Sequence, residues 1–299
     1  MAVRSVGLKQ CNHETMIVKS IKTSQTKDIA PFLKKIRLPV SESHKGQNGK
    51  VLIIGGSQLF HAASLWSAEV ASHFADMVHY ASTEENNEIF LSLKTKFRNG
   101  IVVHREHLES YVKEDDVILI GPGLERNDET KKLTEQVLRQ AQGKQLVIDA
   151  GSLQMMRPEL LKTLQKPAII TPHQQEFEQL FGISITDKSP EDKEKMVQEM
   201  AEKYNCIILL KAITDFVSDG KEVVQIYGGN QGLTKGGTGD ILAGLVAGLV
   251  THSDPVSSCV CASYILKKTA ETLSLDHGYW YNNSDILDTI PKVVNSIFL

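Results

Sequence analysis

From Lys50 onward, short apolar runs rich in β-branched residues alternate with longer stretches that repeat apolar positions at helical spacing. Such runs are typical of strands buried on both faces, and the amphipathic stretches are typical of the helices that cover them. The pattern predicts strands at residues 50–56, 77–82, 101–104, 117–121, 146–150, 168–172 and 206–211, and helices at 62–75, 127–142 and 189–204. We therefore expect an α/β fold with a mainly parallel central sheet covered by helices on both faces.

Two weaker runs, 214–220 and 221–228, meet at Asp219-Gly220 and predict an antiparallel hairpin at the edge of this sheet. Residues 1–30 are polar and mixed, with 16–21 as the only possible strand, so we interpret them as an N-terminal arm that packs on the body or on a neighbouring subunit. Neither an internal repeat nor a low-complexity linker divides the rest. Residues 31–299 are predicted to form a single domain.

Composition narrows the class of protein. A chain of 299 residues with 41% hydrophobic content can bury a large core without disulfides or metals. Its 33 basic and 36 acidic residues give a net charge of -3, which provides no general attraction to nucleic acid or to an anionic membrane. The four cysteines have the spacing of neither a disulfide framework nor a zinc site. We expect a cytoplasmic protein that binds small molecules.

Four turns that follow predicted strands directly, at residues 53–57, 120–124, 148–152 and 171–176, are candidates for a ligand site. In an open parallel sheet, ligands bind at the carboxyl ends of the strands. One glycine-containing turn of this kind is ordinary, but four together outline a cleft. Neither a GxxxxGK[ST] motif nor a GxGxxG after the first strand occurs, which argues against a P-loop and a standard Rossmann site.

The stretch "LTKGGTGDILAGLVAGLV" at 233–250 contains a glycine-rich loop followed by an apolar helix rich in small residues, which is expected to start near Ile241. Gly236, Gly237 and Gly239 allow backbone N–H groups to converge on an anion at the positive end of that helix. Small residues in the helix allow it to lie close to the sheet or to another helix. Asp240 is then either a base that acts on an attacking hydroxyl or a plain N-cap, and the pattern alone leaves both open.

The segments "GKVLIIGGS", "IGPGL", "VIDAGSL", "TPHQQEF", "LLK" and "GGTGDILAGLVAGL", in this order, resemble the ADP/ATP-dependent NAD(P)H-hydrate dehydratases. The resemblance covers about residues 30–299 and implies a ribokinase-like fold. This family also forms the C-terminal half of two-domain proteins that carry an NAD(P)HX epimerase, and no stretch of this chain looks like the epimerase half.

The resemblance implies repair of NADHX and NADPHX, in which the nicotinamide ring is hydrated at carbon 6. ADP or ATP phosphorylates the hydroxyl with the help of Mg²⁺, and phosphate then leaves to regenerate NAD(P)H. Asp240 would remove the hydroxyl proton, and the amides of Gly237, Thr238 and Gly239 would stabilise the transferring phosphoryl group. A homo-oligomer, tetrameric or larger, is also implied.

Further site residues carry over from the family motifs. His173 is expected on the substrate side and Glu176 near Mg²⁺, while Lys211 begins the nucleotide-binding segment. Each of these two residues also has a purely structural alternative. His173 could be a helix-entry residue bonded to backbone, and Lys211 could be a lysine that reaches solvent. The complete expectation is as follows: for substrate binding, Ala63, Gly121, Gly123, His173 and Asp240; for nucleotide binding, Lys211, Ala212, Ile213, Thr214, Asp215, Gly237, Thr238 and Gly239; and for the metal, Glu176.

The chain departs from the family motifs at His61–Ser64, Glu125, Gly151 and Ala212. The first three alter the wall expected to meet the dinucleotide, so a changed substrate stays open. A small-molecule kinase of the same fold, acting on a hydroxymethylpyrimidine or hydroxyethylthiazole, is the first alternative, and a noncatalytic nucleotide-binding regulator is the second. The choice between ADP and ATP and between NADHX and NADPHX stays open as well. "YWYNN" at 279–283 is interpreted as packing.

Overall fold

The computed structural model describes residues 17–298, which form a ten-stranded sheet in the order β1-β10-β9-β8-β7-β6-β5-β2-β3-β4. Neighbouring strands are parallel except β8 with β9 and β9 with β10. The strands are β1 (Ile17–Lys22), β2 (Lys50–Ile54), β3 (Met77–Ala81), β4 (Ile101–Val102), β5 (Val117–Ile120), β6 (Gln145–Ile148), β7 (Ile169–Ile170), β8 (Ile207–Leu210), β9 (Asp215–Ser218) and β10 (Glu222–Tyr227).

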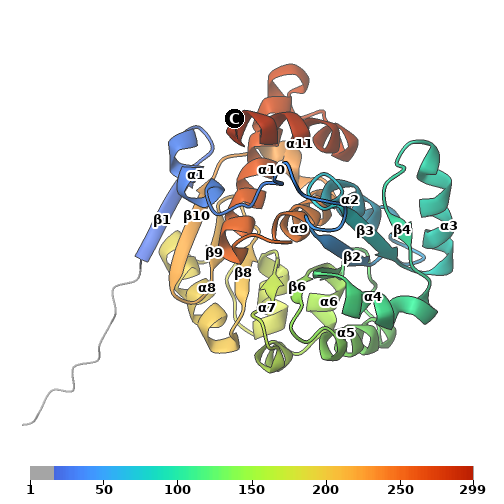
Figure 1. Ribbon diagram of the computed structural model, residues 1–299. Helices are drawn as coiled ribbons and strands as arrows, with labels where there is room; N and C mark the ends of the chain where they lie inside the picture. The colour runs from blue at the N-terminus through green and yellow to red at the C-terminus, as the bar shows by residue number, and fades with distance from the viewer. Residues whose placement is uncertain (1–16, 299) are drawn as a thin grey trace, which may run out of the picture.

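Helices cover both faces of the sheet (Figure 1). One face carries α1 (Thr26–Leu33), α2 (Ala62–Ala71), α9 (Thr238–Leu249), α10 (Pro255–His277) and α11 (Asn283–Phe298), and the other carries α4 (Leu108–Glu114), α5 (Asp128–Gln140), α6 (Ala150–Met155), α7 (Gln174–Phe181) and α8 (Pro190–Tyr204). Helix α3 (Glu84–Ser92) connects β3 to the edge strand β4. The layering is the one that the sequence pattern predicts.

The two faces bury separate apolar clusters because side chains alternate along each strand. In β2, Val51 and Ile53 pack with α2 and α9, whereas Leu52 and Ile54 pack toward α5. All four side chains are buried. A strand covered on both faces needs apolar residues at every position, which explains why these strands have no polar alternation in the sequence.

Every predicted strand from residue 50 onward is present, and the predicted hairpin is β9 and β10. Residues 17–22, from the stretch noted as a possible strand, form β1 and extend the sheet beyond β10. The part of the expected arm at residues 1–16, with Cys11, lies outside the described residues. Predicted helix 62–75 ends earlier, at Ala71, and the helix expected near Ile241 begins at Thr238.

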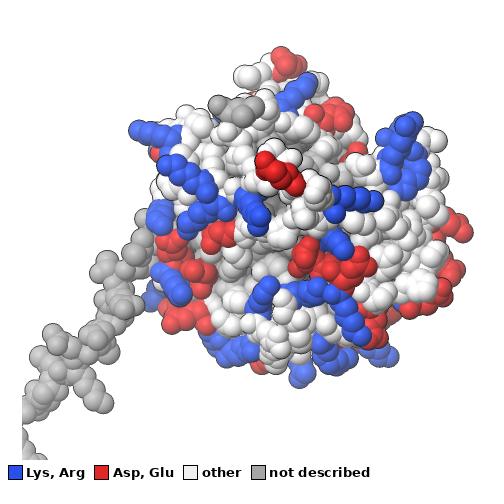
Figure 2. Space-filling model, in the orientation of Figure 1, with Lys and Arg blue, Asp and Glu red and all other residues white. Residues whose placement is uncertain are grey.

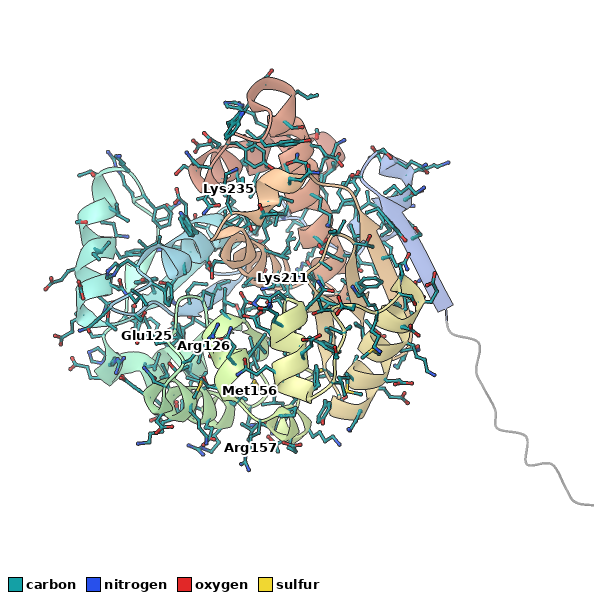
Figure 3. The ribbon with its side chains drawn as sticks, turned by 180° about the vertical axis from the view of Figure 1, so that it is seen from behind. Glu125, Arg126, Met156, Arg157, Lys211 and Lys235 are labelled. Atoms are coloured by element: carbon teal, nitrogen blue, oxygen red, sulfur yellow. The ribbon has the colours of Figure 1, made fainter. Side chains whose placement is uncertain are left out.

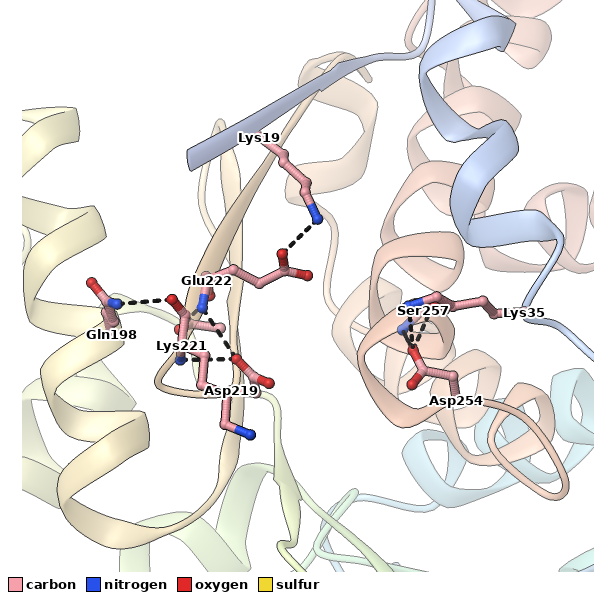
Figure 4. A network of polar contacts seen from close by, with 9 residues as sticks. Lys19, Lys35, Gln198, Asp219, Lys221, Glu222, Asp254 and Ser257 are labelled. Carbon is pink, nitrogen blue, oxygen red and sulfur yellow. Dashed lines mark hydrogen bonds and ion pairs between the residues drawn. The ribbon is translucent and has the colours of Figure 1, made fainter. Parts of the chain in front are cut away.

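Polar contacts fix the hairpin and its neighbour (Figure 4). The Asp219 carboxylate accepts the N–H groups of Lys221 and Glu222 at 3.0 and 3.3 Å, which closes the turn. Lys19 of β1 then pairs with Glu222 at 2.5 Å. This exposed pair contributes little to stability, so the backbone pairing of β1 with β10 holds the strand in place.

Charged side chains of both signs occur on the surface. Lys and Arg side chains are interspersed with Asp and Glu side chains on the face that Figure 2 shows. Among residues 17–298, none of the helices combines the length and apolar content that a membrane crossing needs.

The glycines of α9 allow this helix to lie against α2. A Cβ atom added to Gly244 would lie 2.6 Å from the Ser67 carbonyl oxygen and 2.5 Å from Val70 Cγ1. At Gly248 the added atom would lie 3.0 Å from Phe74 Cβ, which is a milder contact. The expected close approach of a small-residue helix is therefore confirmed, and its partner is α2. This contact places the start of α9 beside the sheet.

We predict that Gly244→Ala lowers the free energy of unfolding by about 1–3 kcal/mol, because the new methyl group pushes backbone away from backbone. Gly248→Ala is the matched control. Its milder overlap is offset by the gain of about 1 kcal/mol in helix propensity, so its stability should stay near that of the wild type. Urea unfolding of the three proteins measures both effects, and a Gly244→Ala variant as stable as the control would contradict the close packing.

Candidate functional site

The candidate site lies where three neighbouring parallel strands end and α9 begins. Asp149 follows β6, His173 follows β7 and Lys211 follows β8. His173 and Lys211 are also joined by an isolated parallel bridge. Because parallel strands end at the same edge, residues more than sixty positions apart in the sequence meet here. The ligand edge predicted from the turns is the edge that carries these side chains.

Lys211 is at the centre of this group and near the centre of the view in Figure 3. Its Nζ lies 2.7 Å from Asp149 Oδ1 and 3.8 Å from Glu176 Oε2. Burial alone lowers the pKa of Lys211, but the negative charges of Asp149 and Glu176 outweigh it and the pKa is raised. The alternative of a lysine that reaches solvent is therefore wrong. Lys211 is a cation between carboxylates, and its side chain is 17% exposed.

Asp240 is the third residue of α9, and the N-cap of this helix is Gly237. The plain N-cap alternative for Asp240 is therefore wrong. Burial, together with the negative charges of Asp149 and Glu176, raises the pKa of Asp240 to about 7, although Lys211 acts in the opposite direction. A carboxyl group with this pKa exchanges its proton near neutral pH, as a general base must.

The expected anion nest centres on Gly237, which is the N-cap of α9 and has a left-handed backbone conformation. Gly237 has φ of +102°, and an added Cβ would lie 2.1 Å from the Trp66 ring, so only glycine fits. The Thr238 hydroxyl donates to the Leu233 carbonyl oxygen at 2.8 Å, which holds the loop against the helix. An added Cβ at Gly239 would lie 3.3 Å from Lys211 Nζ. The start of α9 thus lies beside the Lys211 cation, while the Thr238 N–H donates to the Lys235 carbonyl oxygen at 3.4 Å.

Glu176 and His173 form a capping box at the start of α7. Glu176 N–H donates to His173 Nδ1 at 3.1 Å, and His173 N–H donates to Glu176 Oε2 at 2.9 Å. Gln154 Nε2 donates to Glu176 Oε1 at 3.0 Å. His173 is therefore a helix-entry residue bonded to backbone, as the structural alternative expected. Its Nε2 also lies 3.5 Å from Glu176 Oε1 at the site.

Among residues 17–298, His, Cys, Asp and Glu side chains make no cluster of three arranged to hold a metal by themselves. Mg²⁺ does not need such a cluster, because it usually takes one or two carboxylates and fills its shell with water and phosphate oxygens. Glu176 is buried, and each of its oxygens keeps a lone pair after its hydrogen bond to His173 or Gln154. This oxygen chemistry fits Mg²⁺.

Contacts between neighbouring segments connect the expected substrate-side residues other than His173. An added Cβ on Gly123 would lie 3.0 Å from the Ala63 Cβ, and one on Gly121 would lie 1.8 Å from the Asp149 carbonyl oxygen. The Ser67 hydroxyl contacts the carbonyl oxygens of Ala63 and Asp240 at 3.2 and 2.8 Å. Ser67 of α2 therefore connects Ala63 of the expected substrate wall with the backbone of Asp240, the candidate base.

The departures from the family motifs have structural reasons. A Cβ on Gly151 would lie 2.2 Å from the Leu124 carbonyl oxygen, so the loop after β5 occupies the space that a side chain would fill. His61 Nδ1 lies 2.6 Å from Asn86 Oδ1, and Ser64 Oγ lies 2.8 Å from the buried Tyr80 hydroxyl. His61 and Ser64, which differ from the family motif, are therefore hydrogen-bonded to other side chains of the protein. Glu125 lines a pocket of about 280 Å³ at the end of this wall, near Arg126 in Figure 3.

The segment 211–215 divides into an anchored and an open part. Asp215 is buried and accepts hydrogen bonds from Ala212 N–H at 2.9 Å and from the Ser263 hydroxyl at 2.6 Å. Lys267 Nζ donates to the Ile213 carbonyl oxygen at 2.9 Å. The Ile213 side chain is 95% exposed. Asp215 therefore holds the loop, while Ile213 is the side chain that is open to a ligand.

Asp149 and Gln154 belong to the site although the sequence analysis gave them no role. A carboxylate placed directly after a strand at the predicted ligand edge was the available signal for Asp149. The next residue, Ala150, has φ of +45°, which is strained for a residue with a side chain and fits a functional position. No sequence signal identified Gln154, because its role depends on how α6 packs beside α7.

Residues 51–292 match the family model described as NAD(P)H-hydrate dehydratase. The chain belongs to the NAD(P)H-hydrate dehydratase family. It is 32% identical to the bifunctional NAD(P)H-hydrate repair enzyme Nnr of Methanocaldococcus jannaschii over 88% of this chain and 51% of that protein. It is 30% identical to the ADP-dependent (S)-NAD(P)H-hydrate dehydratase of Nitrosopumilus maritimus over 93% of this chain and 98% of that protein.

The fold is ribokinase-like. The ADP/ATP-dependent NAD(P)H-hydrate dehydratase of Bacillus subtilis, co-crystallised with ATP/Mg²⁺, matches with a TM-score of 0.80 and 22% identity over 93% of this chain and 99% of that one. The chain spans about half the length of the bifunctional relatives that it matches.

We predict that Asp240→Asn raises the melting temperature at pH 8 but leaves it nearly unchanged at about pH 3, since these two pH values lie above and below the range of the shift. The pKa of Asp240 rises from 3.8 to about 7 on folding. Below the lower pKa both states are protonated, whereas above the higher pKa the folded protein bears a partly buried charge that asparagine lacks. Thermal unfolding across this range measures the difference, and a pH-independent difference would contradict the raised pKa.

Proposed function

We propose that the protein dehydrates hydrated NAD(P)H back to NAD(P)H at the expense of a nucleotide. The observation that carries this proposal is Asp240, a carboxyl group with a pKa of about 7 in the first turn of α9. Asp240 thus places a proton acceptor in the same helical turn as the proposed anion nest. Membership of the NAD(P)H-hydrate dehydratase family supports the choice of substrate.

In the proposed reaction, Asp240 accepts the proton of the hydroxyl on carbon 6 of the hydrated ring. The hydroxyl oxygen then bonds to the terminal phosphorus of the nucleotide, and the bond from that phosphorus to the bridging oxygen breaks. From ADP the products are AMP and the phosphorylated ring. The ring nitrogen's lone pair then expels phosphate as a proton leaves the neighbouring ring carbon, which gives NAD(P)H and inorganic phosphate.

The glycine nest and Lys211 stabilise the transferring phosphoryl group. Its charge spreads over the oxygens in the transition state, and preorganised N–H groups at a helix N-terminus interact with it most strongly there. Lys211 adds a positive charge, held in place by Asp149 at 2.7 Å. Mg²⁺ near Glu176 would neutralise further phosphate charge.

We propose ADP as the donor, because the relative from Nitrosopumilus maritimus that matches over nearly its whole length is ADP-dependent. The exposed Ile213 side chain, two residues after Lys211, provides an apolar surface for the base of the nucleotide. The pocket at the end of the substrate wall, lined by Ser57, Thr83 and Glu125, has room for more of the dinucleotide.

A vitamin-precursor kinase of the same fold is the alternative, since it would use the same nest and base. The family match over residues 51–292 favours the dehydratase. The homo-oligomer and the cytoplasmic location implied by the sequence stay predictions.

We expect the purified protein, mixed with chemically hydrated NADH, ADP and Mg²⁺, to restore the absorbance of reduced nicotinamide. Asp240→Asn should lower the rate by roughly 10²–10⁴, the contribution of a positioned general base. Gly248→Ala, which alters α9 away from the nest, is the control and should keep the wild-type rate. No recovery with ADP or ATP, from protein that binds nucleotide, would contradict the proposal in favour of a kinase.

A further inference from the structure

The aromatic segment at 279–283 packs against the loop of residues 230–237, here called the glycine loop. The Tyr281 hydroxyl donates to Asn230 Oδ1 at 2.6 Å, and an added Cβ on Gly232 would lie 2.3 Å from the Tyr281 ring. Lys235 Nζ donates to the Tyr279 carbonyl oxygen at 2.7 Å. The segment does pack, as the sequence analysis expected, but it packs on the loop that leads into the nest.

Asn283, the first residue of α11, makes the contact nearest to the nest. Its Nδ2 donates to the Gly236 carbonyl oxygen at 2.8 Å. The same nitrogen would lie 2.2 Å from a Cβ added to Gly237. Asn283 is 8% exposed, so this side chain is enclosed between α11 and the glycine loop.

The Gly236 carbonyl and the Gly237 N–H belong to one peptide plane and point in opposite directions. By binding the carbonyl, Asn283 directs the Gly237 N–H away from α11. Within residues 17–298, this N–H donates to no protein acceptor. The plane lies between two glycines, whose backbone rotates most freely, so a flip of this peptide meets little steric resistance. An external contact is therefore needed to keep the N–H in one direction.

The orientation of the Asn283 amide follows from this contact. The opposite orientation would place Oδ1 against the Gly236 carbonyl oxygen, and two acceptors repel. In the observed orientation Asn283 Oδ1 is buried and has no hydrogen-bond partner. A buried acceptor without a partner lowers stability, and such atoms call for an explanation. The hydrogen bond to the nest provides it.

We propose that Asn283 is a positioning residue for phosphoryl transfer, which holds the peptide between Gly236 and Gly237 so that the Gly237 N–H faces the transferring group. This inference rests on the proposed function, in which the nest stabilises that group. Asn283 itself does not touch the nucleotide. It acts through the carbonyl of Gly236.

The test compares Asn283→Leu with Asn282→Ala. Leucine keeps the approximate volume but removes the donor and the unpaired acceptor. Since loss of one transition-state donor costs roughly 10²–10³ in rate and here the donor is only released, we expect kcat to fall about tenfold. KM for ADP and the melting temperature should stay close to wild type. Asn282 Oδ1 accepts the N–H groups of Ser284 and Asp285 at 2.7 and 3.2 Å, so its loss should lower the melting temperature and leave kcat unchanged.

A second readout does not require turnover. In protein labelled with ¹⁵N-glycine, ADP and Mg²⁺ should shift the Gly237 amide resonance of the wild type and shift it much less in Asn283→Leu. An unchanged kcat, or an equal loss of kcat in both variants, would overturn the role of Asn283. A wild type that shows the shift but does not restore NADH would instead contradict the proposed function. Equal shifts in wild type and Asn283→Leu would also overturn the inference.

Discussion

The chemistry of this site depends on one positive charge, that of Lys211, shared among three carboxylates. Lys211 makes its shortest contact with Asp149 and a longer one with Glu176. A single lysine does not neutralise three neighbouring carboxylates, and like charges close together favour keeping a proton on one of them. That one is Asp240, whose pKa of about 7 results from burial and from its acidic neighbours. Because the Lys211 amine pairs with Asp149, Asp240 is the carboxyl group that accepts a proton near neutral pH.

The fold creates this arrangement by converging elements that are distant in the sequence. Asp149, Glu176 and Lys211 follow three adjacent strands, so their spacing is set by the sheet. Asp240 lies on α9, which packs against α2 through its glycines. The Ser67 hydroxyl of α2 donates to the Asp240 carbonyl oxygen. The buried core on that face is thus part of the site, because a shift of α9 would move both the nest and the base.

Much of the fold could be predicted from sequence, because strands buried on both faces leave continuous apolar runs, and their turns mark one edge. The nest and Asp240 were also accessible, since glycine and aspartate before a small-residue helix form a local pattern. Contacts between distant elements could not be predicted from the sequence. That Lys211 turns inward to Asp149, that Asp215 faces α10, and that Asn283 reaches Gly236 depend on tertiary packing, which no local pattern encodes.

The most direct test of the account is the pH dependence of kcat/KM with hydrated NADH and ADP, since this ratio reports ionisations in the free enzyme. The account predicts that kcat/KM rises about tenfold per pH unit below pH 7 and levels off above it, as Asp240 loses its proton. The residual activity of Asp240→Asn should lack this rise. A wild-type profile that is flat across pH 7, or a rise that persists in Asp240→Asn, would contradict the assignment of Asp240 as the base.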